Sequence, residues 1–230
     1  MLPWERLATA DAPDGKPLEL RRRGHEYRIR AGGQELMSNE DEPSSRSLSE
    51  LGCAHITPGP EVRVLVGGLG MGFTLRAALD LVGKGNVEVA ELVPAVVEWN
   101  EGPLGPLAGH PLRDPRTVLY LGDVRDRIRA ASGDFDAILL DVDNGPIALA
   151  HAKNDALYGR RGIAQCWDAL KPGGVLGVWS LLDDQRYTTR LRQQGFDARA
   201  QKVFGSRKDR GREHVIWVAQ KSQRSRKPRR

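Results

Sequence analysis

The chain has 230 residues, of which 40% are hydrophobic and 28% charged, with 26 glycines and 14 prolines. This composition suits one globular domain with a small appendage, and it excludes a disordered chain, a collagen and a coiled coil. No stretch approaches the ~20 unbroken apolar residues of a membrane span, and the N-terminus lacks the apolar segment of a secretory signal. Cys53 and Cys166 have no metal or redox spacing, so we expect a reduced, cytoplasmic protein.

The net charge of +5 comes from the C-terminal end. Residues 221–230 hold six positive charges and no acid, which leaves 29 basic and 30 acidic residues in 1–220. Such a tail is typically a solvated, disordered end, and weak contact with nucleic acid or another polyanion is the alternative. The rest of the chain offers no obvious basic patch to accompany it.

Residues 1–60 are polar and turn-rich, which predicts a small β-rich region with one helix. The alternation of apolar and charged residues predicts short strands at 18–24, 26–33 and 34–39. A helix is predicted over 44–56, with Ser44 or Ser45 as its N-cap and Gly52 at its end.

Residues 61–220 repeat a strand–helix rhythm. Strands are predicted at 62–68, 87–92, 116–123, 134–145 and 175–182, alternating with helices at 73–83, 94–102, 124–131, 158–174 and 183–195. The segments 198–204 and 213–220 are expected to form a terminal antiparallel pair. This rhythm predicts an α/β fold with a Rossmann-like mixed sheet, mostly parallel and covered on both faces.

In such sheets, ligands bind beyond the carboxyl ends of the strands. The first strand is followed by a glycine-rich turn, Gly67-Gly68-Leu69-Gly70-Met71-Gly72, and then by a helix. Glycines let the backbone approach a ligand, and the helix N-terminus presents N–H groups to it. A ligand site is therefore expected here, although such turns also serve strand–helix packing alone. It is not a phosphate-binding P-loop, because no Gly-Lys-Ser/Thr follows.

Acids follow the next two strands. Glu91 lies about 20 residues beyond the turn, a spacing that favours hydrogen bonds to ribose hydroxyls over a solvated loop position. Asp123 could accept a hydrogen bond from an adenine amino group, or it could be the N-cap of the following helix.

The fourth strand ends in Asp141-Val142-Asp143-Asn144-Gly145-Pro146. Neighbouring carboxylates raise one another's proton affinity, which suits a general base or a cation-binding pocket. Turn chemistry explains Asn144 to Pro146 but not Asp141, so Asp141, with Asp143, is the candidate catalytic acid.

Asn154 and Tyr158 follow this acidic turn and are candidates for a substrate pocket. Four tryptophans in apolar patterns are expected in the core: Trp99, Trp167, Trp179 and Trp217. No cluster has metal-ligand spacing, and no Gly-x-Ser-x-Gly elbow occurs.

Together, these segments resemble the spermidine synthase (polyamine aminopropyltransferase) family, whose catalytic domain has the class I S-adenosylmethionine methyltransferase fold. The resemblance runs from Val62 to about Val178 through VLVGGLGMGFTLRAAL, VAELVPAVVEWN, DPRTVLYLGD, FDAILLDVDNGP and LYGRRGIAQCWDALKPGGVL. The ordered set covers about half the chain and is more specific than any single piece.

The resemblance implies roles for the residues at the strand ends. The loop around Gly68, Gly70, Met71 and Gly72 would pass close to the nucleoside and the methionine-derived part of S-adenosylmethionine or its decarboxylated form. Glu91, with Leu92, would hold the ribose; Asp123 and Val124 would contact the adenine. Asp141 would match the acid that binds and helps deprotonate the attacking amine. The resemblance also implies a homodimer.

This chain departs from the family pattern in the polyamine half. Met71 stands where the family's loop carries an Asp that helps hold the amine of the decarboxylated donor. Ser45 stands near the position of a family Tyr, and the second acid of the family's Asp-Ser-x-Asp-Pro turn is displaced. Losing the loop acid removes repulsion toward the carboxylate of intact S-adenosylmethionine, which leaves room for methyl transfer.

We therefore expect a spermidine synthase-like transferase that moves an aminopropyl or methyl group to a small nucleophile such as a polyamine, with Asp141 as base and orienter. Alternatives are a methyltransferase directed to nucleic acid or another substrate, and a non-catalytic adenosyl-ligand-binding protein. A nicotinamide dehydrogenase is disfavoured because the phosphate-type glycine spacing is missing. The expected division of the chain is a β-rich region at 1–60, a catalytic domain at 61–220 and a basic tail at 221–230.

Overall fold

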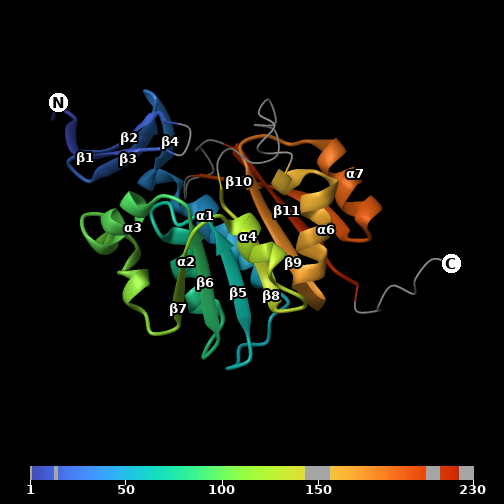
Figure 1. Ribbon diagram of the computed structural model, residues 1–230. Coiled ribbons are helices and arrows are strands. Elements are labelled where there is room, and N and C mark those ends of the chain that lie inside the picture. Colours follow the sequence, from blue (N-terminus) through green and yellow to red (C-terminus); the bar gives the residue numbers. More distant parts are fainter. Residues whose placement is uncertain (1, 13–14, 143–155, 206–212, 223–230) are drawn as a thin grey trace.

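The computed structural model describes residues 2–12, 15–142, 156–205 and 213–222. It has a four-stranded antiparallel sheet near the N-terminus and a seven-stranded sheet with helices on both faces (Figure 1). The small sheet lies in chain order: β1 (Glu5–Asp11), β2 (Pro17–Arg23), β3 (Glu26–Ala31) and β4 (Gln34–Ser38). The sequence predicted the last three strands but not β1, because a register shift between Arg6 and Ala8 breaks its alternation.

The seven-stranded sheet has the order β10-β11-β9-β8-β5-β6-β7. The five strands from β5 to β9 are parallel, β11 is antiparallel to β9, and β10 is antiparallel to β11. The predicted Rossmann-like mixed sheet is therefore confirmed. The strands are β5 (Arg63–Gly67), β6 (Asn86–Glu91), β7 (Thr117–Leu121), β8 (Phe135–Leu140), β9 (Leu170–Ser180), β10 (Asp197–Phe204) and β11 (Glu213–Gln220).

Two sets of helices cover the two faces of this sheet. Alternate side chains of β5 belong to different cores, with Val64 and Val66 in one and Leu65 in the other. The first core is completed by α1 (Glu42–Cys53), α2 (Phe73–Leu81) and α3 (Pro94–Glu101), the second by α4 (Val124–Arg129), α6 (Arg160–Ala169) and α7 (Gln185–Gln194). Short 3-10 helices lie at Asn39–Asp41, Gly105–Ala108 and Pro111–Arg113.

The four tryptophans expected in the core are buried. Each is at most 9% exposed. Among the described helices, none combines the length and the apolar character that crossing a bilayer requires.

The predicted ends of α1 are wrong. The helix begins at Glu42, so Ser44 and Ser45 lie inside its first turn and are buried. Gly52 lies inside the last turn, where a Cβ atom would approach Leu139 Cδ2 to 2.3 Å. The glycine therefore permits close packing of α1 on the large sheet instead of ending the helix.

The predicted end of α6 is also wrong. The helix stops at Ala169, and Leu170 has the extended angles φ −79° and ψ 141°. The Lys-Pro-Gly-Gly segment expected to close the helix instead opens β9, where Leu170 pairs with Phe135 before a register shift.

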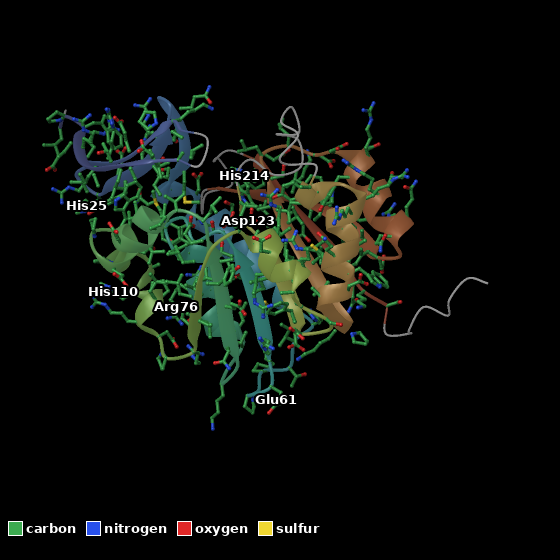
Figure 2. The ribbon with its side chains drawn as sticks, viewed as in Figure 1. His25, Glu61, Arg76, His110, Asp123 and His214 are labelled. Carbon is green, nitrogen blue, oxygen red and sulfur yellow. The ribbon has the colours of Figure 1, made fainter. Side chains whose placement is uncertain are left out.

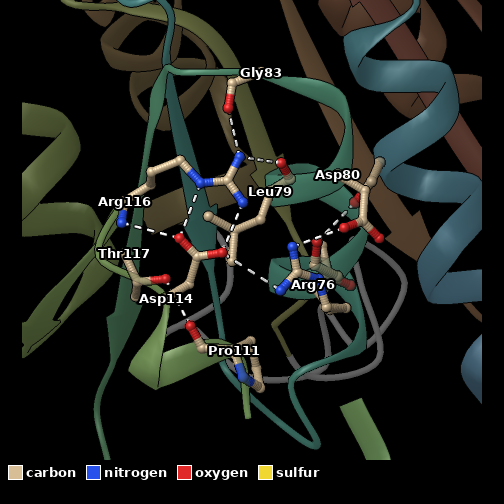
Figure 3. Close-up of polar contacts among 10 residues, drawn as sticks. Arg76, Leu79, Asp80, Gly83, Pro111, Asp114, Arg116 and Thr117 are labelled. Atoms are coloured by element: carbon tan, nitrogen blue, oxygen red, sulfur yellow. Dashed lines mark hydrogen bonds and ion pairs between the residues drawn. The ribbon is translucent and has the colours of Figure 1, made fainter. Parts of the chain in front are cut away.

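A cluster of charged side chains ties α2 to the loop before β7 (Figure 3). Asp114 accepts hydrogen bonds from the Arg116 guanidinium at 2.9 and 2.6 Å, and Arg76 approaches the same carboxylate to 3.5 Å. Arg116 also donates to the carbonyls of Leu79 and Gly83. The Arg116 guanidinium lowers the pKa of Asp114 to about 2. This cluster fixes the edge strand of the sheet to α2.

Candidate active site

The carboxyl ends of β5, β6, β7 and β8 meet at one edge of the sheet. Because β5 pairs with β6 on one side and with β8 on the other, strand order reverses at β5, where α/β proteins bind ligands. Backbone hydrogen bonds join the strand ends: Gly68 N–H donates to Ala90 O at 2.9 Å, and Asp141 N–H donates to Gly67 O at 2.8 Å. Figure 2 shows Asp123 at this upper edge and Glu61 at the opposite one.

The glycine-rich turn after β5 runs against the end of β8. Gly68 has φ +88°, and a Cβ atom there would lie 2.4 Å from the carbonyl oxygen of Asp141. Any side chain at this position would push the turn off the strand that carries the candidate catalytic acid. At Gly70, a Cβ atom would lie 2.6 Å from Met37 Cε, so Met37 of the small sheet lies against the turn.

The turn ends at the N-terminus of α2. Gly72 is the N-cap residue, with φ +84° and no side-chain cap, so the first N–H groups of α2 face the edge of the sheet. Asn100 of α3 holds the turn by donating to Gly70 O at 2.8 Å and to Val96 O at 2.9 Å. Met71 is 1% exposed and packs in the apolar core.

Glu91 at the end of β6 is buried and linked to the same turn. Its carboxylate accepts hydrogen bonds from Leu69 N–H at 2.9 Å and Val93 N–H at 2.8 Å. Burial raises the pKa of Glu91, while backbone N–H groups of Val93, Leu69, Leu92 and Gly70 oppose the rise. Both carboxylate oxygens are thus engaged with backbone N–H groups, and contact with ribose hydroxyls stays a prediction.

Asp123 follows β7 and is the N-cap of α4. It accepts a hydrogen bond from Arg125 N–H at 2.8 Å and pairs with the Arg125 guanidinium at 2.5 Å. The capping alternative is thus confirmed, and contact with adenine stays a prediction. Leu92 is 49% exposed at this edge, while Val124 is 6% exposed and lies behind Gly67.

Asp141 is the most perturbed acid at the edge. Its Oδ2 accepts a 2.5 Å hydrogen bond from the Thr74 hydroxyl of α2, and the Ser45 hydroxyl of α1 donates to the same carboxylate. Burial raises the pKa of Asp141 to about 6; the two hydroxyls oppose this rise and the charge of Asp41 adds to it. A carboxylate of this kind is ionised at neutral pH but accepts a proton more readily than an exposed one.

Sequence reasoning did not assign the hydroxyls that hold Asp141. Thr74 lies in the first turn of the helix after the glycines, which places it at the correct edge and could have revealed it. The sequence suggested Ser45 as a possible helix N-cap and, by family resemblance, as the residue near a family Tyr, but nothing local indicates that α1 packs across the strand ends. Met37 and Asn100 likewise reach the turn only through tertiary packing.

Several predicted residues lie in segments that are not described. Asp143, Asn144 and Asn154 fall within 143–155, outside the described residues. Tyr158 is described: it is 1% exposed, donates to Val142 O at 3.1 Å, and packs edge-on against Tyr187. Its place in a substrate pocket stays a prediction. Among the described residues, no three His, Cys, Asp or Glu side chains are grouped to hold a metal ion.

Comparisons with known proteins agree with this architecture. No protein-family model matches the chain. It is 33% identical over 120 residues to putrescine N-methyltransferase 4 of Nicotiana tabacum, a match covering 52% of this chain and 29% of the relative. It is 34% identical over 125 residues to the polyamine aminopropyltransferase of Nitrosomonas europaea, covering 54% and 36%. The match thus spans about a third of these curated relatives.

Two solved structures superpose on nearly the whole of this chain. The spermidine synthase of Thermotoga maritima superposes with a TM-score of 0.75 at 19% identity, covering 95% of this chain and 74% of that one. A spermidine synthase in complex with the transition state analogue AdoDATO gives 0.74 at 18% identity, covering 95% and 73%. These superpositions show the class I methyltransferase-type α/β fold. Within that class, the sequence matches support a spermidine synthase-like family.

Proposed function

We propose that the protein is a spermidine synthase-like transferase that moves a group from an S-adenosyl donor to an amine of a polyamine. The observation that carries this proposal is Asp141: a half-buried carboxylate with a raised pKa, held by two hydroxyls directly beside a glycine-rich turn at the strand-order reversal. The sequence matches to a putrescine N-methyltransferase and a polyamine aminopropyltransferase support the same chemistry.

The residues at the carboxyl ends of the strands suit an S-adenosyl donor in size and charge. The turn from Gly68 to Gly72 carries no polar side chain that would compete for its own N–H groups, so the backbone can approach a nucleoside. Glu91 would bind the ribose hydroxyls, and Leu92 offers an exposed apolar side chain for the adenine. Asp123, with Val124 beside it, would line the far end of that pocket.

Asp141 would act on the acceptor. The donor's sulfonium makes its adjoining carbons electrophilic, so the main task is to align an amine with one of them. Asp141 would accept a hydrogen bond from the amine and take its proton as the C–N bond forms and the C–S bond breaks. Thr74 and Ser45 fix the carboxylate for this role.

Met71 bears on which group is transferred. Its side chain packs in the apolar core, so this position of the turn presents no acid to the amine of a decarboxylated donor. The uncapped N-terminus of α2 at Gly72 favours a carboxylate instead. These features favour intact S-adenosylmethionine, and therefore methyl transfer, over aminopropyl transfer.

Calorimetry with the two donors tests the proposal directly. We expect S-adenosylmethionine to bind more tightly than its decarboxylated form, and putrescine to become methylated in its presence. Asp141→Asn should retain donor binding and lose turnover. If neither donor binds at millimolar concentration, the transferase proposal is wrong. Binding without turnover against any amine would favour a non-catalytic adenosyl-ligand-binding protein.

Three further features belong to this proposal. Asp143, Asn144, Asn154 and Tyr158 would complete the acceptor pocket beside Asp141. The family resemblance supports a homodimer, whose oligomeric state sedimentation measures, and the spacing of the two cysteines supports a location in the cytoplasm. Contact of the tail at 221–230 with a polyanion predicts salt-sensitive binding that is lost when the tail is deleted.

A further inference from the structure

The outer face of the N-terminal sheet is rich in arginine. The opposite face carries Leu20 and Ile29, which pack in the core, so the outer face is turned away from the large sheet. Figure 2 shows many side chains projecting around this small sheet. We call the following group the arginine face: Arg6, Arg21, Arg23, Arg28 and Arg30, with Trp4 and the acids Glu19, Glu26 and Glu35 between them.

Three of these arginines form a row across neighbouring strands. In the strand register, Arg6 of β1 lies opposite Arg21 of β2, and Arg21 lies opposite Arg28 of β3. Like charges directly opposite each other destabilise a sheet. Such a row needs anions to offset its repulsion.

The protein supplies only part of that compensation. Glu19 pairs with Arg21 at 2.8 Å and with Arg6 at 3.6 Å. Glu26 pairs with Arg23 at 2.8 Å and with Arg28 at 3.6 Å, and Glu35 pairs with Arg28 at 2.7 Å. Five arginines against three glutamates leave the arginine face with an excess of two positive charges. The Nε atom of Arg28 is buried and has no hydrogen-bond partner among the described residues.

The arginine face also has a defined shape. A hollow of about 170 Å³ is lined by Trp4, Arg21, Arg28, Arg30 and Glu35. The Trp4 ring holds the guanidinium groups of Arg23 and Arg28, each 4.6 Å from the ring centroid. Cation–π contacts and ion pairs thus order several of the guanidinium groups before any ligand arrives.

We propose that the arginine face binds the phosphodiester backbone of a single-stranded nucleic acid. Guanidinium groups match phosphate oxygens in geometry. Strand geometry spaces these arginines about 5 Å apart across the sheet and about 7 Å along it, so one strand of phosphates can contact several at once. This inference does not depend on the proposed transferase activity.

Fluorescence anisotropy with a labelled 20-nucleotide oligouridylate tests the proposal. This probe lacks adenine, so it does not target the nucleoside site. The full-length chain is compared with R21Q/R28Q/R30Q, and the tail is kept in every variant so that its contribution cancels. The matched control, R22Q/R46Q/R199Q, removes three charges elsewhere; Arg22, for example, lies on the other face of β2 and pairs with Glu5 at 2.8 Å.

We expect the arginine-face variant to bind at least about tenfold more weakly at 0.1 M salt, with a salt slope smaller by about 2, and the control to change little. Equal losses in variant and control, no loss in the variant, or no binding by the wild-type chain at 0.05 M salt would overturn the proposal. Displacement of the probe by polyglutamate at equal charge would overturn the choice of nucleic acid.

Folding is checked separately by thermal melting. The arginine-face variant should melt close to wild type, because it loses a like-charge row together with the surface ion pairs of Arg21 and Arg28. If it does not fold, R21K/R28K/R30K keeps the charge and is used instead. Because lysine cannot form forked hydrogen bonds, this variant should keep the salt slope and bind more weakly. Unchanged affinity in it would contradict the proposal.

Discussion

Replacing Asp141 by asparagine should stabilise the folded protein at alkaline pH while abolishing the proposed activity. Burial raises the pKa of this carboxyl from 3.8 to about 6. Because the folded-state pKa is the higher one, the group favours folding only when protonated, and that contribution is lost as pH rises through about 6. A shift of about two units corresponds to about 3 kcal/mol, since each unit is about 1.4 kcal/mol.

Asparagine keeps the size of the side chain and an acceptor for the Thr74 hydroxyl, but it has no charge to desolvate. The expected gain at pH 8 is therefore up to about 3 kcal/mol, or about 6–12 °C in melting temperature for a chain of this length. It should fade between pH 6 and pH 4, where the wild-type carboxyl is protonated in the folded state.

Urea unfolding at pH 4, 6 and 8 measures this dependence. Asp80→Asn is the matched control: Asp80 is 51% exposed and pairs with Arg76 on the surface of α2, so its replacement should change stability by less than about 1 kcal/mol at every pH. If Asp141→Asn is less stable than wild type at pH 8, the carboxylate is a favourable anion in the folded state. The argument that assigns it a raised pKa is then refuted.

Thr74→Val should raise the pKa of Asp141 and move the acid limb of the pH–rate profile upward, because a hydroxyl that favours the ionised form is lost; Thr74→Ser should restore the wild-type profile. Glu91→Gln should weaken S-adenosylmethionine binding in calorimetry and lower stability by about 1–3 kcal/mol, since one of two buried backbone N–H groups loses its acceptor. Gly52→Ala should destabilise by about 1–3 kcal/mol in urea despite its better helix propensity, because its Cβ would meet Leu139; an unchanged midpoint would show that α1 shifts without cost.

The strand–helix order of the large sheet was predictable because buried parallel strands appear in sequence as continuous apolar runs. The segment AILL at 137–140 is an example: all four side chains are fully buried in β8. The same rule placed Glu91 and Asp141 at the strand ends. Sequence patterns did not predict β1, because its register shift breaks the alternation of apolar and polar residues. They also did not predict that Lys-Pro-Gly-Gly opens β9.

The surroundings of those acids were not predictable. Asp141 acquires its raised pKa from burial and its hydrogen bonds from Thr74 and Ser45, which are 67 and 96 residues away in the chain. Proton affinity depends on distance and desolvation, and local sequence patterns report neither.

The sequence by itself determined the α/β class, the edge where a ligand would bind and the acids that end the strands, because these depend on hydrophobic period and chain order. Only the tertiary structure decided how those acids are held and where charge collects. Residues 1–220 are nearly neutral in sum, yet strand pairing places Arg6, Arg21 and Arg28 in one row. Electrostatic effects depend on the distances between charges, and those distances exist only once the sheets have formed.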